Sequence, residues 1–89
     1  VVGATYPEQL AFLRNELKST FFLVPGYGAQ GGGAKDVAGG FDKDGRGAII
    51  NSSRGIMCAY KKGNFDEKDY AVAARLEAER MRDELNTVR

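Results

Sequence analysis

Residues 21–41 read FFLVPGYGAQGGGAKDVAGGF, and this stretch decides both the fold and the kind of site. A run of four apolar residues breaks at Pro25, and three glycines with the spacing G-x-G-x-x-G begin at Gly26. A continuous apolar run is typical of a strand buried on both faces. The stretch therefore predicts a buried strand over residues 21–24, followed by a long loop that either holds a phosphate or only connects two elements.

A dinucleotide-binding interpretation of the three glycines fails two tests. That motif needs a long helix that opens inside the glycine loop, whereas the glycines on either side of residues 34–38 leave room for only one or two helical turns. It also needs an acidic residue about 20 positions further on, where this chain has Asn51-Ser52-Ser53. A Walker A loop is excluded too, because Gly33 is followed by Ala34-Lys35 and not by Lys-Ser or Lys-Thr.

Strand-like and helical segments alternate along the rest of the chain. Residues 1–4 form a short β-type run, and the following Thr5-x-x-Glu8 matches a capping box that would start a helix with Leu10, Leu13 and Leu17 on its apolar stripe. Residues 47–51 predict a third strand. Asn64 or Asp66 would cap a last helix, whose apolar stripe contains Tyr70, Ala74, Ala78, Met81 and Leu85 and whose other face is charged. This alternation predicts an α/β fold with a parallel sheet.

Composition excludes several classes of function. With 89 residues the chain makes one domain at most, and its net charge of +1 argues against a nucleic-acid or membrane-surface partner. The absence of histidine removes His-based catalysis and His metal sites, so we expect no metal. The single cysteine, Cys58, forms no internal disulfide, which favours a reducing, cytoplasmic setting. No apolar run reaches the roughly 18–20 residues of a membrane span.

Two polar side chains follow neighbouring strands of the predicted sheet. Gln30 is the one polar residue of the glycine loop up to Gly33, and Arg54 follows the third strand. The carboxyl ends of parallel strands share one edge, where sites form in α/β proteins. An amide can donate and accept at once, and a guanidinium fork matches phosphate oxygens, with backbone N–H groups of residues 53–55 as further donors. The pair therefore strengthens the case for a phosphate site, and the alternatives of a surface ion-pair arginine and a merely flexible loop stay open.

Three motifs carry a resemblance to a known family. The segments VVGATYPEQL, FLVPGYGAQGG and GRGAIINSSRGI are similar to the C-terminal portion of orotidine 5'-phosphate decarboxylase (OMP decarboxylase) of the longer bacterial type. The resemblance runs through all 89 residues and implies a cytoplasmic homodimeric (β/α)₈ TIM barrel, a lyase of pyrimidine biosynthesis that works without a metal or organic cofactor. On this basis residues 1–89 would supply strands 6–8 and their helices, and the N-terminal portion of the barrel would be absent.

The resemblance also implies roles for individual residues. Gln30 would contact both the phosphate and the pyrimidine of the nucleotide, and Arg54 would hold the phosphate dianion. The backbone at Ser53 and Arg54 would face the same phosphate, and Pro25 would lie near the pyrimidine edge. Many relatives have Gly-Arg where this chain has Ser53-Arg54.

The catalytic array of the family has no counterpart in this chain. That array contains a D-x-K-x-x-D motif, whereas Asp42, Lys43 and Asp44 have a different spacing and are interpreted as a solvated turn. We therefore expect no catalytic residue here and no decarboxylation of OMP to UMP by the 89 residues alone. Two alternatives stay open: an isolated non-catalytic phosphate-binding fragment, and a related phosphate-binding barrel such as a hexulose-phosphate synthase relative.

Overall fold

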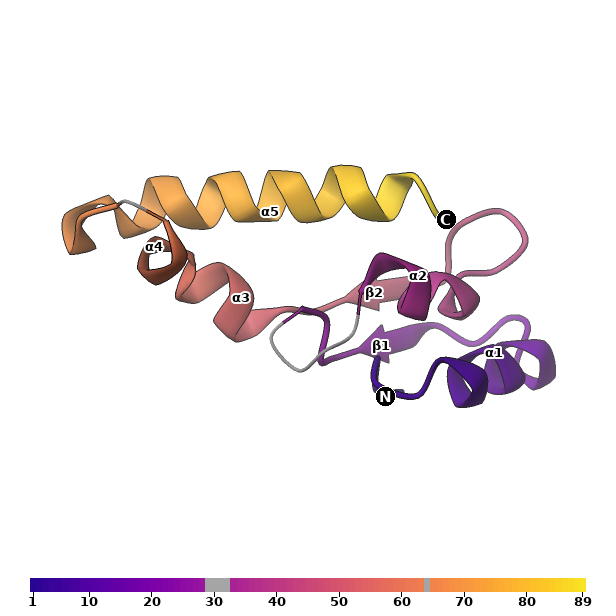
Figure 1. Cartoon of the computed structure of the whole chain (residues 1–89). Helices are drawn as coiled ribbons and strands as arrows, with labels where there is room; N and C mark the ends of the chain where they lie inside the picture. Colours follow the sequence, from indigo (N-terminus) through magenta and orange to yellow (C-terminus); the bar gives the residue numbers. More distant parts are fainter. Residues whose placement is uncertain (29–32, 64) are drawn as a thin grey trace.

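The computed structural model describes residues 1–28, 33–63 and 65–89. Its strands lie at the centre, α1 lies beside their amino ends, and the long helix α5 runs along one side of the sheet (Figure 1). The elements and their bounds are α1 Pro7–Glu16, β1 Phe22–Val24, α2 Ala34–Val37, the 3-10 turn η1 Ala38–Gly40, β2 Ala48–Ile50, α3 Ser53–Met57, α4 Ala59–Lys62, the 3-10 turn η2 Glu67–Asp69 and α5 Tyr70–Asn86. The predicted α/β class is confirmed.

The two strands of the described ranges pair in parallel, as predicted. Phe22 lies opposite Ala48, and Val24 lies opposite Ile50. A parallel pair places both carboxyl ends at one edge, and the chain that leaves β2 there continues into α3 and α4 (Figure 1).

The predicted first strand, residues 1–4, lies along the other edge of β1 without completing a strand pair. Val2 N–H donates to Leu23 O and Ala4 N–H donates to Pro25 O, each at 2.9 Å. In a parallel ladder the return bond would come from residue 25 to Val2 O, but proline has no N–H to donate. The segment therefore aligns with β1 as expected, while Pro25 prevents a regular ladder.

The prediction that residues 21–24 are buried on both faces is wrong for this chain. Phe22 and Val24 are buried, whereas the side chain of Leu23 is 44% exposed and that of Ile49 beside it is 55% exposed. One face of the sheet therefore packs on the core, and the other presents apolar side chains. The core contains Ala4, Leu10, Phe22, Val24, Tyr27, Ala34, Val37 and Met81.

The helix starts also differ from the predictions. Helix α1 begins after Tyr6 without a side-chain cap, so Thr5 and Glu8 do not form a capping box. Asp66 precedes η2 rather than α5, and it too makes no side-chain cap bond; Asn64 lies outside the described residues.

Two short helices were not predicted. The segments that form α3 and α4 were expected to be the end of a strand and a connecting segment. Residues 34–38 do form short helical turns, and a Cβ on Gly39 would stand only 3.0 Å from Ala11 Cβ, so α1 would have to shift slightly to admit a side chain there.

The turn at Asp42 is built by its own carboxylate. Its Oδ1 accepts from the N–H groups of Asp44 and Arg46, each at 2.9 Å. These backbone donors hold the pKa of Asp42 below its usual value, chiefly through Arg46 N–H. The interpretation of this segment as a polar turn is confirmed.

A buried arginine joins the segments at the amino ends of the strands. Arg14 is 7% exposed, and its guanidinium lies 3.9 Å from the ring centroid of Phe22. Its Nε donates to Gly40 O and its Nη2 to Gly47 O, both at 2.8 Å. Its Nη1 donates to carbonyls that follow α1, those of Leu17 at 3.0 Å, Lys18 at 3.5 Å and Thr20 at 2.8 Å.

We expect Arg14→Met to lower the free energy of unfolding by about 3 kcal/mol, because buried carbonyls would lose charged donors without gaining others. Urea unfolding followed by circular dichroism measures the effect. The control is Arg75→Met, which removes one exposed ion pair of α5 and should cost less than about 1 kcal/mol. Equal unfolding midpoints for the two variants would contradict the role given to Arg14.

Candidate functional site

A small pocket of about 90 Å³ lies at the carboxyl ends of β1 and β2. It is lined by Pro25, Gly26, Tyr27, Asn51, Ser52, Ser53 and Arg54. Two larger hollows, of about 550 and 630 Å³, lie elsewhere: one between β2 and α5, the other between the end of α1 and the Asp42 turn. The small pocket is the one that combines polar side chains, backbone N–H groups and the strand ends where sites form in parallel sheets.

The turn after β1 forms one wall of the pocket. Pro25 ends the strand, and Gly26 and Gly28 have φ of 92° and 79°, a conformation that side-chain-bearing residues rarely adopt. Tyr27 N–H donates to Asn51 O at 3.4 Å, and Asn51 N–H donates to Val24 O at 2.9 Å. These bonds tie the turn after β1 to the segment that leaves β2.

The opposite wall is the first turn of α3. Ser53 and Arg54 are its first two residues, and both are exposed. Asn51 Nδ2 donates to Ser53 Oγ at 3.0 Å, which orders the entry to the helix. The first bond back into this turn comes from Ile56 N–H to Ser52 O, at 3.1 Å, and the N–H groups that precede it in a helix point outward.

Arg54 does not take part in the ion pairs among the described residues. Those pairs join Arg75, Arg80 and Arg82 of α5 to acidic neighbours on the same helix. Among the described residues, therefore, Arg54 does not behave as the surface ion-pair arginine that was the alternative prediction. A guanidinium at this position can bind an anion with two parallel N–H donors.

Sequence reasoning missed Ser52, whose hydroxyl lies inside the wall of the pocket. The residue is buried, and its Oγ lies 3.5 Å from where a Cβ on Gly28 would stand and 2.4 Å from where one on Gly55 would stand. Ser52 therefore occupies the space between the turn after β1 and the start of α3. In the sequence, only the glycines at positions 28 and 55 could have indicated that a side chain lies between these two segments.

The structure brings together three of the four predicted site residues. Pro25, Ser53 and Arg54 line the same pocket. Gln30, the fourth, lies outside the described residues. The role of each of the four in binding a ligand stays a prediction.

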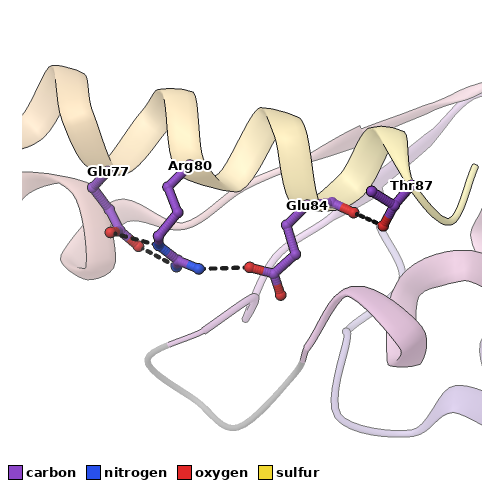
Figure 2. Close-up of polar contacts among 4 residues, drawn as sticks. All are labelled: Glu77, Arg80, Glu84 and Thr87. Carbon is purple, nitrogen blue, oxygen red and sulfur yellow. Dashed lines mark hydrogen bonds and ion pairs between the residues drawn. The ribbon is translucent and has the colours of Figure 1, made fainter.

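Tyr27 connects the pocket to α5. It is 3% exposed and belongs to the same core cluster as Met81 of that helix. Burial raises the pKa of the Tyr27 hydroxyl above its usual value, and the Glu84 carboxylate raises it further. Tyr27 therefore stays protonated at neutral pH. The hydrogen bonds of Glu84 to its own helix neighbours are drawn in Figure 2.

Other kinds of site find little support. Residues 1–28, 33–63 and 65–89 contain no cluster of acidic or cysteine side chains that could hold a metal ion. In the same ranges no helix is long and apolar enough to cross a membrane.

The strands and the pocket define a parallel α/β segment with an anion-sized polar site at its carboxyl edge. Among known proteins, the chain is similar to orotidine 5'-phosphate decarboxylases. It is 54% identical to the enzyme of Clostridium tetani (strain Massachusetts / E88) over 85 residues and 52% identical to that of Clostridium acetobutylicum over 85 residues, and each match covers 96% of this chain. It is 47% identical over 89 residues to the enzyme of Rhodopirellula baltica.

The family resemblance inferred from the sequence is thereby confirmed. The chain spans about 29–30% of the length of these curated relatives. No family model matches the chain. No solved structure matches it.

We expect Gly55→Ala to destabilise the fold by about 1–2 kcal/mol, because the added methyl would stand 2.4 Å from Ser52 Oγ in a buried position. The test is thermal unfolding of this variant, of Ser52→Ala and of the double variant. Ser52→Ala removes the clashing oxygen, so the double variant should recover most of the stability lost by Gly55→Ala. Strict additivity of the two changes would show that the two side chains do not meet.

Proposed function

We propose that this chain is the phosphate-holding part of an orotidine 5'-phosphate decarboxylase, which converts OMP to UMP and CO₂. One observation carries the proposal: the pocket at the carboxyl ends of two parallel strands unites Pro25, Ser53 and Arg54. Relatives about half identical to this chain bear the name of that enzyme. The nucleotide substrate of the proposal follows from that name.

In this proposal Arg54 grips the phosphate dianion through its guanidinium fork, and the N–H groups at Ser53 and Arg54 add donors. Gln30 spans the phosphate and the pyrimidine, and Pro25 lies near the pyrimidine edge. None of these groups touches the carboxylate that leaves. They raise the rate by binding a remote part of the substrate, so that binding energy stabilises the transition state formed elsewhere in the site.

The shape of the chain supports a place within a larger fold. Its radius of gyration is 13.9 Å, against about 12 Å for a compact domain of this length. Its accessible surface is 5987 Å², against about 5,100 Å² for a compact monomer of this mass. Both differences fit a segment that packs against further protein.

The exposed sheet face supports a barrel in particular. Phe21, Leu23 and Ile49 are exposed on or beside the strands, and their alternate neighbours Phe22 and Val24 face the core. In a TIM barrel each strand presents one face to the helices and the other to the packed interior. Residues 1–4, β1 and β2 lie in chain order across the sheet, as strands 6, 7 and 8 would, and the hollow between β2 and α5 would receive the next strand.

The remaining properties of the enzyme belong to the same proposal. Residues 1–89 would form the C-terminal segment of the barrel, a cytoplasmic homodimer without metal or cofactor. The Lys/Asp array would come from the N-terminal part, so we expect the 89 residues alone to bind phosphate without decarboxylating OMP.

A chimera tests the proposal directly. We expect an enzyme in which this chain replaces the matching segment of the Clostridium tetani relative to convert OMP to UMP, followed by ultraviolet absorbance. Arg54→Ala in the chimera should lower kcat/KM by an amount that corresponds to about 2–4 kcal/mol of lost transition-state stabilisation, the cost of a lost charged contact. Arg75→Ala should change kcat/KM little. Gln30→Ala should cost less than Arg54→Ala, and the two changes should be non-additive because both residues grip one phosphate.

Unchanged kcat/KM in the Arg54→Ala chimera would rule out that Arg54 binds the phosphate. A chimera that folds and binds phosphate but leaves OMP intact would favour the alternative of a non-catalytic phosphate-binding segment.

A further inference from the structure

Two adjacent serines in the segment after β2 line the small pocket, and they differ in burial. Ser53 is exposed, and its Oγ accepts from Asn51 Nδ2 at 3.0 Å. Ser52 is only 7% exposed. A hydroxyl that is removed from water without a hydrogen-bond partner costs free energy. The contacts that remain open to the Ser52 hydroxyl therefore indicate what this wall of the pocket can bind.

The Ser52 hydroxyl does not cap α3. Ser52 directly precedes the helix, where a serine oxygen commonly accepts from N–H groups of the first turn, but it makes no such bond here. No other hydrogen bond among residues 1–28, 33–63 and 65–89 involves its Oγ. In these ranges every completely enclosed side-chain nitrogen or oxygen has a partner, so the Ser52 oxygen is not completely enclosed. Because Ser52 lines the pocket, we assign its open surface to that space.

Two glycines leave the space in which this hydroxyl lies. Ser52 Oγ is 3.5 Å from where a Cβ on Gly28 would stand and 2.4 Å from where one on Gly55 would stand. Gly28 belongs to the turn after β1, and Gly55 belongs to the first turn of α3. The oxygen therefore lies between the two walls of the pocket, where a ligand group held by both walls would also lie.

The charge of the pocket selects an anion as that ligand group. Arg54 is the charged residue among those that line the pocket, and no acidic side chain is among them. A serine hydroxyl has a proton to donate, and phosphate oxygens accept from hydroxyl, guanidinium and backbone N–H donors alike. A donor that is shielded from water interacts more strongly with such a charge than an exposed donor does.

We propose that Ser52 is a further phosphate-binding residue, whose hydroxyl donates to a phosphate oxygen between the two walls while the exposed Arg54 guanidinium binds the same phosphate. This inference rests on the proposed function and adds a buried contact to it. The contact belongs to the phosphate alone, so a nucleoside without a phosphate does not use it.

The experiment compares the binding of UMP and of uridine to the chimera with the Clostridium tetani enzyme, by isothermal titration calorimetry. Ser52→Ala should raise the Kd for UMP about tenfold, the effect of one lost hydrogen bond to a charged group, and should leave the Kd for uridine within about twofold. Ser52→Cys should have nearly the same effect, because a thiol is a weak donor. Cysteine also fills the space that alanine leaves empty, so this variant keeps the test informative if Ser52→Ala folds poorly.

Ser19→Ala is the matched control, because it removes an exposed serine hydroxyl in the hollow near the end of α1, away from the small pocket. It should leave both Kd values within about twofold. Unchanged UMP affinity in both Ser52 variants would overturn this inference alone. An equal weakening of UMP and uridine would assign Ser52 to packing and would overturn it too, whereas a chimera that binds no UMP at all would overturn the proposed function with it.

Discussion

A single guanidinium organises the amino ends of the strands. Arg14 donates to five backbone carbonyls that lie in three separate segments and stacks on Phe22 of β1. A carboxylate partner would use two or three donors at one point, whereas carbonyls from different segments spread the same donors over a wide area. Because both strands start beside this group, their register and the meeting of their carboxyl ends depend on it.

The pocket lies at the far ends of those strands, and its shape depends on a missing backbone N–H group and on missing side chains. Pro25 has no N–H, so the chain leaves the sheet there instead of extending the ladder. Gly28 and Gly55 have no side chains, so the Ser52 hydroxyl can lie between the two walls. The turn that results is tied to β2 by backbone bonds, and its Tyr27 side chain lies in the core cluster that also contains Met81 of α5.

The sequence predicted the parts of the fold that follow from local periodicity. The parallel strands, the position of Arg54 after the last strand and the presence of the two long helices were correctly expected, whereas the caps expected for both helices were not found. The short helices α3 and α4 were missed, because four or five residues are too few to show a helical period. The exposure of Leu23 was missed because an apolar strand predicts that both faces are buried, but does not tell which segments pack against each face.

Sequence reasoning missed the charged residue that joins the amino ends of the strands. Arg14 was not foreseen as buried, because charged side chains are rarely buried and its partners are carbonyls, which every residue has. Such contacts depend on which segments meet in space, and a single sequence does not contain that information. Pro25, Ser53 and Arg54 could be found because strand order alone fixes their common edge.

The central claim is that the two strand ends form one phosphate site, and nuclear magnetic resonance of the chimera with labelled arginine tests it most directly. On addition of UMP, the Arg54 Nε–H signal and the backbone amides of residues 53–55 should shift together and saturate with one Kd, while the Arg75 Nε–H signal stays in place. Signals of Arg54 that do not move at saturating UMP would contradict the account.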